Sequence, residues 1–212
     1  MDIQKKEKSL KKFWKKFWFL LWKDDSIKGW IFSVIFLFLF IKLIFFPVLN
    51  LVTGTSLPLA IVESCSMYHK GDMASDFNSW WTRHEGKYAQ YIINDLDFKA
   101  FSFKNGFNKG DILLITGTKP EKLKAGDIIV FEAGQRNPII HRIINISIED
   151  NKYFFSTMGD NNNGQLSIEK RISSDQIIGK AGFRLAPLLG WVKLIFYDGR
   201  NPESERGLCN EN

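Results

Sequence analysis

The longest apolar segment of the chain lies near its N-terminus. Residues 30–52 read WIFSVIFLFLFIKLIFFPVLNLV, and only Ser33, Lys42, Pro47 and Asn50 among them are not apolar. As an α-helix this segment would be about 34 Å long at roughly 1.5 Å per residue, enough to cross the hydrocarbon core of a bilayer. One lysine costs about 2.5–3.5 kcal/mol, and each apolar neighbour returns about 0.3–0.6 kcal/mol. The pattern therefore predicts a transmembrane helix over 30–52.

A cleaved signal peptide is the alternative interpretation, because a basic segment precedes the apolar one. The apolar core of a signal peptide is usually about 7–15 residues long, and this segment is longer and begins well into the chain. We therefore expect it to be retained as a membrane anchor.

Positive charge is concentrated before this anchor. Residues 1–28 hold nine lysines and four acidic residues, which is +5 of the formal net charge of +6. By the positive-inside rule, we expect a single-pass protein of the cell membrane with a cytoplasmic N-terminus and residues 53–212 outside the cytoplasm. The rest of the chain is nearly neutral, which disfavours a nucleic-acid partner.

The basic segment, residues 1–29, also has an amphipathic pattern. Its aromatic residues, among them Phe13, Trp14, Phe17 and Trp18, recur at helical spacing between the lysines. Such a pattern predicts a helix at the surface of the lipid bilayer, with aromatic rings at headgroup level. A solvated basic tail is the alternative, although water is a poor environment for so many aromatic rings.

Beyond the anchor, short β-rich segments alternate with turn signals. The segments are LPLAIVE, DILLIT, GDIIVFE, PIIHRIINISI, KYFFST, QIIGKAGFRL and WVKLIF. Strand signals at this spacing predict a mainly β domain over residues 53–197. Residues 68–107 are the exception and are expected to form a partly helical insertion. The polar tail, residues 198–212, is expected to be disordered.

Two serines follow the first of these β segments. Ser64 and Ser66 flank Cys65, an arrangement in which one hydroxyl can attack a carbonyl and the other can stabilise the oxyanion. A plain turn is the alternative interpretation. Cys65 is a rival nucleophile, disfavoured because no cation adjoins it to stabilise a thiolate. With Cys209 as the only other cysteine, there is neither a disulfide framework nor a thiolate zinc cluster.

Histidine is scarce, with three residues in all. His69 and His84 fall in the polar insertion and are expected in exposed loops. His141 interrupts an apolar strand, either as a satisfied core residue or as a general base that accepts a serine proton near neutral pH. Asp160, in a Gly-Asp-Asn-Asn turn, could hold such an imidazole in one tautomer.

Taken in order, these motifs resemble signal peptidase I. The matching blocks are Ser-Cys-Ser-Met, GDIIVFE, the His-Arg strand, MGDNN and IIGKAGFRLAPLLGWVK, spread over residues 57–197. They are most similar to the archaeal and endoplasmic-reticulum branch, which uses histidine where the bacterial branch uses lysine. The resemblance implies a signal-peptidase-like β catalytic domain.

The resemblance also implies roles for individual residues. Ser66 corresponds to the nucleophile, Ser64 to the oxyanion-hole hydroxyl, His141 to the general base and Asp160 to its acidic partner or to a structural support. In this family a glycine usually separates the two serines, and this chain has Cys65 there instead. The family often has an acidic or other residue followed by proline after the serines, where this chain has Tyr68-His69.

A further aspartate of the family has no counterpart, since Leu166 occupies its position. Glu169 or Asp175 are the candidates that could supply the missing carboxylate.

The function implied is that of a membrane-bound serine endopeptidase that removes signal peptides from exported preproteins. Its partners would be preprotein signal peptides, the lipid bilayer and the protein-translocation machinery, with no metal or organic cofactor. Three alternatives remain: a non-enzymatic membrane-anchored β module such as a chaperone or assembly subunit, a catalytically inactive peptidase homologue, and a self-processing or prepilin-type peptidase.

Overall fold

The protein was analysed as a computed structural model that describes residues 2–70, 77–135, 137–200 and 206–210. It divides into two compact units, residues 1–52 and 53–212, and each is described by itself.

The N-terminal unit consists of helices. Helix α1 (Asp2–Trp22) covers most of the basic segment, so the helix expected there is present. Ser26 caps the helix that follows, because its side-chain oxygen accepts a hydrogen bond from the Gly29 amide. Phe17 of α1 packs edge-on against Phe32 and Phe36, at ring-centroid distances of 5.8 and 5.2 Å.

The apolar segment is one continuous helical run. It comprises α2 (Ile27–Phe40), a π-helical turn (Ile41–Phe45) and α3 (Phe46–Thr53). The π-helical turn ends two residues before Pro47, whose missing N–H interrupts the α-helical hydrogen-bond ladder. This run of 27 residues contains an 18-residue window with a mean hydropathy of 2.7, so it is long and apolar enough to cross a membrane.

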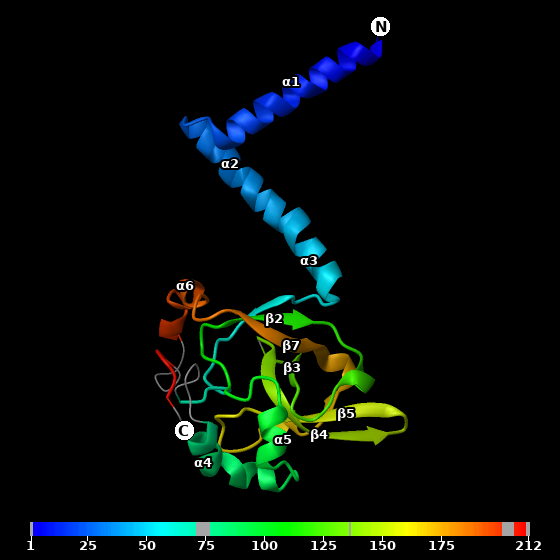
Figure 1. The fold of residues 1–212 in the computed structure, drawn as a ribbon, viewed down its shortest axis with the longest axis vertical. Coiled ribbons are helices and arrows are strands. Elements are labelled where there is room, and N and C mark those ends of the chain that lie inside the picture. The colour runs from blue at the N-terminus through cyan, green and yellow to red at the C-terminus, as the bar shows by residue number, and fades with distance from the viewer. Residues whose placement is uncertain (1, 71–76, 136, 201–205, 211–212) are drawn as a thin grey trace. The chain divides into compact units, whose positions relative to one another are not determined.

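The second unit is built on one curled antiparallel sheet of seven strands (Figure 1). The strands are β1 (Leu59–Ile61), β2 (Ile112–Thr116), β3 (Ile128–Phe131), β4 (Ile139–Glu149), β5 (Lys152–Met158), β6 (Ile172–Ser173) and β7 (Ile177–Ala186). Their order in the sheet is β1-β2-β7-β3-β4-β5-β6. The expected mainly β fold with an N-terminal apolar helix is therefore confirmed.

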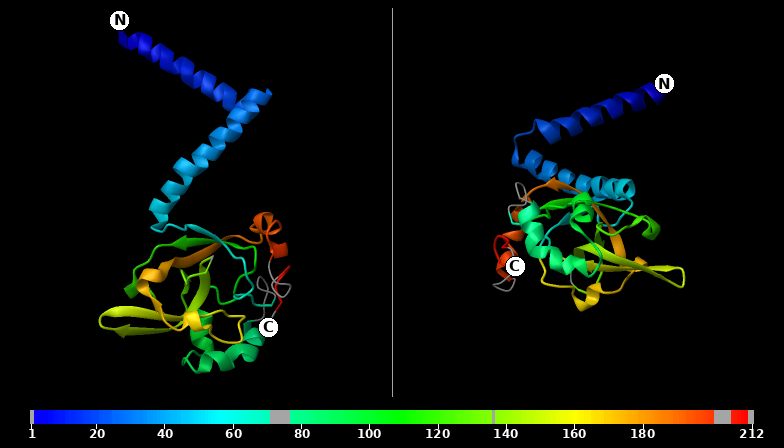
Figure 2. Two further views of the ribbon diagram at one scale, coloured as in Figure 1. Left: turned by 180° about the vertical axis from the view of Figure 1, so that it is seen from behind. Right: turned by 60° about the horizontal axis from the view of Figure 1, so that its bottom comes forward.

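Side-chain alternation along β3 shows how the sheet is buried on both faces. Ile128 and Val130 belong to one apolar cluster, whereas Ile129 and Phe131 belong to another. Successive side chains of a strand point to opposite faces, so a strand with four buried residues must be covered on both. By contrast, the β4–β5 hairpin projects from the rest of the sheet (Figures 1 and 2).

The insertion is partly helical, as expected, and carries two α-helices of the domain. Helix α4 (Phe77–Ala89) and helix α5 (Asp95–Ala100) contribute the aromatic core of a cluster that also includes Ile144 and Met158 of the sheet. The aromatic residues of this cluster are Trp80, Trp81, Tyr88 and Phe98. Residues 71–76 of the insertion lie outside the described residues.

The tail has more structure than the sequence suggested. Asp198–Arg200 form a 3₁₀ turn. Just before the tail, Trp191–Leu194 form the short helix α6, so the prediction that WVKLIF is a β segment was wrong. Cys209 forms a disulfide with Cys65, 144 residues earlier. A single bridge of this kind is not a disulfide framework, but the pairing was not expected. Residues 201–205 and 211–212 of the tail lie outside the described residues.

Candidate active site

The two serines lie in a loop that follows β1, defined here as the serine loop (residues 63–67). Ser64 Oγ and Ser66 Oγ are 3.1 Å apart and share a hydrogen bond. The loop belongs to no strand, and individual hydrogen bonds to its backbone carbonyls hold it. The amide of Asn161 donates to the Ser66 carbonyl at 2.7 Å, and the amide of Phe107 donates to the Met67 carbonyl at 3.0 Å.

His141 lies on β4, opposite Ile129 of β3, and only 4% of its surface is exposed. Its Nδ1 atom is hydrogen-bonded to Oε1 of Glu169. An ionised carboxylate can only accept, so this bond places the imidazole proton on Nδ1 and leaves Nε2 with its lone pair. Such a ring is set up to accept a proton at Nε2.

Glu169 is itself held by two further donors. Thr157 Oγ1 donates to its Oε1 at 3.1 Å, and the amide of Leu166 donates to its Oε2 at 2.8 Å. The residue ends the 3₁₀ turn Ser167–Glu169, which folds its carboxylate back toward the start of the turn. Of the two substitute acids suggested by the sequence, the structure therefore brings Glu169 to His141.

The other two acids lie elsewhere. Asp175 is exposed, in the 3₁₀ turn Ser174–Gln176. Asp160, expected beside His141, is fully buried among other partners: Tyr88 Oη donates to it at 2.9 Å and Arg142 Nε at 2.9 Å. Asp160 is therefore not paired with His141, because the neighbouring Arg142 occupies its carboxylate; of the two roles that the resemblance allowed, the contacts favour the structural support.

Arg142 uses all five of its N–H groups in the interior. Besides its bonds to Asp160, it donates to three backbone carbonyls, those of Ser102, Phe103 and Gly126. Burial alone would raise the pKa of Asp160, but the guanidinium and the surrounding hydrogen bonds hold it far below its usual value. Asp160 is thus a permanently charged structural acid.

His69 belongs to the same buried network. Its Nε2 is 3.1 Å from Asp160 Oδ2, and its ring stacks on Trp80 with centroids 3.7 Å apart. Burial lowers the pKa of His69, and the bond to Asp160 opposes that shift only in part. His84 is also buried, with Nδ1 2.7 Å from the Trp80 carbonyl. Both residues were expected in exposed loops, and that expectation was wrong.

A groove of about 620 Å³ joins the serine loop to the His141 strand. Ser64, Ser66 and His141 all line it, although the Ser66 hydroxyl bonds to Ser64 rather than to the imidazole. Most of the remaining lining is apolar: Leu57, Leu59, Ala60, Ile61, Val62, Phe107, Val130, Pro138, Ile139, Ile140 and Leu166. Long catalytic contacts are common before substrate binds.

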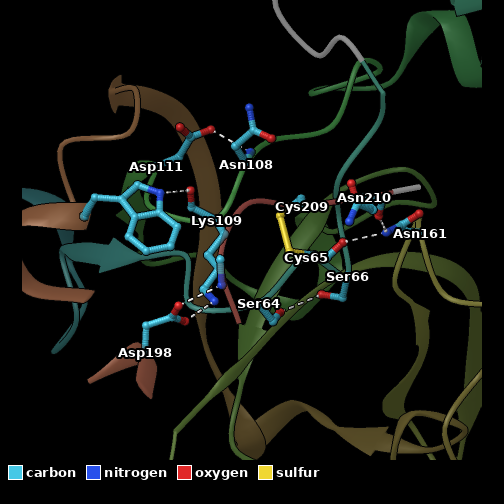
Figure 3. The surroundings of a disulfide bond; sticks show 12 residues. Ser64, Cys65, Ser66, Asn108, Lys109, Asp111, Asn161, Asp198, Cys209 and Asn210 are labelled. Carbon is cyan, nitrogen blue, oxygen red and sulfur yellow. Dashed lines mark hydrogen bonds and ion pairs between the residues drawn. A yellow bond between two sulfur atoms is a disulfide. The ribbon is translucent and has the colours of Figure 1, made fainter. Parts of the chain in front are cut away.

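Cys65 is not available as a nucleophile in this state, because it is oxidised in the bond to Cys209 (Figure 3). Across the described ranges of the chain, no group of three or more His, Cys, Asp and Glu side chains is arranged to hold a metal ion. The groove therefore presents hydroxyls and an imidazole, and a buried carboxylate, that of Glu169, supports the imidazole from behind; these are the groups used in acyl transfer.

Comparison with known proteins identifies similar chains. The protein is 35% identical over 109 residues to the human signal peptidase complex catalytic subunit SEC11C, a match of 46% of this chain and 54% of that protein. It is 40% identical over 106 residues to the signal peptidase complex catalytic subunit SEC11 of Lodderomyces elongisporus, covering 47% of this chain and 63% of that protein.

A third relative, the SEC11 subunit of Scheffersomyces stipitis, is 39% identical over 62 residues, which are 29% of this chain. No protein-family model matches the chain. The chain spans about half the length of the curated relatives that it matches, 54% for the human subunit. These similarities confirm the resemblance to signal peptidases that the sequence motifs suggested.

Sequence reasoning left the acid beside His141 open and did not anticipate the network around Arg142. An arginine inside the apolar strand Ile139–Ile144 was the available signal, since a buried charge needs a partner. Tyr88 gave no comparable signal, because an aromatic residue in a helix usually packs in a core.

Proposed function

We propose that this protein is a membrane-anchored serine endopeptidase that cleaves signal peptides from exported preproteins. The observation that carries the proposal is the shared, mostly apolar groove, which is lined by Ser66 and by His141, the hydrogen-bond partner of the buried Glu169. The relatives, named catalytic subunits of a signal peptidase complex, support it.

In the proposed reaction Ser66 Oγ attacks the carbonyl carbon before the scissile bond and gives its proton to His141 Nε2. Glu169 keeps the other ring nitrogen protonated and stabilises the imidazolium. The Ser66 amide and the Ser64 hydroxyl receive the oxyanion. The imidazolium then protonates the leaving amine, and water hydrolyses the acyl-enzyme with His141 again as the base.

Two features support a substrate that emerges from a membrane. The helical run Ile27–Thr53 would hold the domain at a bilayer. Ser66 is the fourteenth residue after Val52, at most about 46 Å away along extended chain. The apolar groove suits the small apolar side chains that precede a signal-peptide cleavage site.

The disulfide supports the proposed orientation. Cys65 and Cys209 lie in the second unit, and disulfides form and persist mainly in oxidising compartments. Together with the lysines before the apolar run, it favours a cytoplasmic N-terminus and a catalytic domain on the opposite side of the membrane. The relatives are named subunits of a complex, and we therefore propose that this chain also binds partner subunits.

The test is cleavage of a fluorogenic preprotein peptide with alanine at the first and third positions before the cut. Detergent-solubilised membranes that contain the full chain retain any partner subunits. We expect Ser66→Ala and His141→Ala to reduce kcat/KM to the background, and Ser64→Ala to reduce it about 10²–10³-fold. Ser56→Ala, at an exposed serine outside the loop, is the matched control and should be fully active.

Full cleavage by Ser66→Ala would overturn the proposal and leave a non-enzymatic membrane-anchored module. Equal, background-level turnover by the wild type and Ser66→Ala, with a correctly folded wild type, would instead indicate an inactive homologue. A fluorogenic prepilin-type peptide in the same assay distinguishes a signal peptidase from a self-processing or prepilin-type peptidase. The latter predicts cleavage of the prepilin-type peptide alone.

A further inference from the structure

The residue between the two proposed catalytic serines is covalently tied to the C-terminal segment of the chain, residues 206–210. The Cys65–Cys209 bond joins positions 144 residues apart, with Ser64 and Ser66 on either side of Cys65 (Figure 3). In the sequence resemblance, this position usually holds a glycine, which cannot form such a bond.

The C-terminal segment is fixed at a second point. The amide of Gly207 donates to Asp198 Oδ2 at 2.7 Å, and Asp198 Oδ1 is paired with the buried ammonium of Lys109. The Lys109 carbonyl in turn accepts the Trp191 indole N–H at 3.0 Å. The disulfide therefore ties the serine loop to a segment that is anchored in the domain, rather than to a loose end.

Asn161 joins the same two segments without a covalent bond. Its side-chain Nδ2 donates to the Cys65 carbonyl at 3.1 Å and to the Asn210 carbonyl at 3.0 Å (Figure 3). Its backbone amide donates to the Ser66 carbonyl at 2.7 Å. With only 2% of its surface exposed, Asn161 sits between the serine loop and the C-terminal segment and holds both.

These contacts replace strand pairing, because β1 ends at Ile61 and the serine loop belongs to no strand. We propose that the Cys65–Cys209 disulfide and Asn161 are positioning elements of the active site: they use the anchored C-terminal segment to hold the Ser66 and Ser64 hydroxyls in their reactive arrangement. The inference rests on the proposed function and deepens it. Neither Cys65 nor Asn161 takes part in the bond-making or bond-breaking steps.

Activity should consequently depend on the redox state of this one bond. A dithiol reductant attacks one sulfur as a thiolate, and a mixed disulfide forms as the Cys65–Cys209 bond breaks. The second thiol of the reductant then attacks this mixed disulfide and releases the remaining cysteine as a thiol. The protein gains two electrons and two protons as two thiols, and the reductant is oxidised to its own disulfide.

The test compares oxidised and dithiothreitol-reduced wild-type protein in the solubilised full-chain preparation, with thiol titration to verify complete reduction. We expect kcat to fall tenfold or more and KM to change less than about threefold, since small displacements of reacting groups cost up to about 10²-fold. The Cys65→Ser/Cys209→Ser double variant should show the same low kcat and no response to dithiothreitol.

A control separates positioning from general destabilisation. Leu123→Ala removes a buried side chain from an apolar cluster other than the one that contains Met67 of the serine loop. The variant should lower Tm without lowering kcat of the folded protein. Hydrogen exchange gives a readout that needs no activity. On reduction, amide exchange in residues 63–68 should increase at least tenfold while β3 stays unchanged.

Unchanged kcat after complete reduction, with Ser66→Ala inactive, would overturn this inference and leave the proposed function intact. An equal loss of kcat in Leu123→Ala would also overturn it. If instead the wild type cleaves no better than Ser66→Ala, the proposed function fails, and this inference falls with it. Unchanged exchange in residues 63–68 overturns it whatever the activity.

Discussion

The imidazole of His141 is hydrogen-bonded to the carboxylate of Glu169, although 28 residues separate them in the chain. Strand β4 carries the histidine, and a 3₁₀ turn after β5 returns the glutamate to it. Pairing of β4 with β5 brings the two segments together. The contact gives the proposed general base a defined tautomer without help from Asp160.

Replacing Glu169 by glutamine should reduce kcat/KM about 10³–10⁴-fold, because the amide cannot stabilise an imidazolium and can favour the wrong tautomer. Asp175→Asn is the matched control, since Asp175 is exposed and was the other acid that the sequence suggested. Cleavage of the fluorogenic peptide measures both. A larger loss in Asp175→Asn than in Glu169→Gln would contradict the assignment.

Gly159→Ala should lower activity by crowding the serine loop. A Cβ at this glycine would lie 2.8 Å from the Ser66 carbonyl oxygen, which is backbone and must shift. Overpacking of this kind costs about 1–3 kcal/mol. Gly164→Ala provides the control, because nothing lies within 4 Å of a Cβ there. We expect a reduced kcat in the first variant only, measured with Tm for each.

Asp160→Asn should destabilise the domain strongly. The substitution leaves the guanidinium of Arg142 buried without its counter-charge, which typically costs about 3–5 kcal/mol. The matched control is Glu149→Gln, which breaks the exposed pair with Arg171 and should cost less than about 1 kcal/mol. Urea unfolding followed by tryptophan fluorescence gives both values, and equal losses would refute a structural role for the buried pair.

His69 should make stability depend on pH. Because burial lowers its pKa, the folded protein keeps the ring neutral where an unfolded histidine, with a pKa of about 6.5, binds a proton. The unfolded state then holds more protons, so the free energy of unfolding rises with pH in that interval. The contribution is complete above about pH 7 and declines as pH falls below about 6.5.

A His69→Gln variant tests this dependence, since Asp160, Arg142 and His84, the charged and titratable groups that act on the ring, are retained. Urea unfolding at pH 7.5, 6.5 and 5.5 should show a steeper loss of stability toward acid in the wild type than in the variant. Parallel pH profiles for the two proteins would show that His69 does not contribute.

The strands and the serine pair could be predicted because their signals are local. Alternating or continuous apolar residues between turn signals indicated most of the sheet, and β3 is buried at all four positions. The apolar run that includes Trp30–Val52 was recognisable from length and composition alone. Such features depend on neighbours in sequence and need no knowledge of the tertiary structure.

The partners of the acids could not be predicted, because they are set by contacts between distant segments. Asp160 lies in a turn that sequence patterns identify, yet its pairing with Arg142 depends on the register between β4 and β5. Glu169 reaches His141 through a 3₁₀ turn that spacing alone does not distinguish from the exposed turn at Asp175. The Cys65–Cys209 pairing had no sequence signal beyond the presence of two cysteines.

The last strand of the sheet in sequence, β7, lies near its middle, between β2 and β3. Within the described sheet, strand pairing connects the edge pair β1–β2, which leads into Ser66, to the strand that bears His141 through β7 and β3. A ribosome must therefore complete residues 177–186 before the two halves can close on each other. The strand order thus delays assembly of the proposed active site until late in translation.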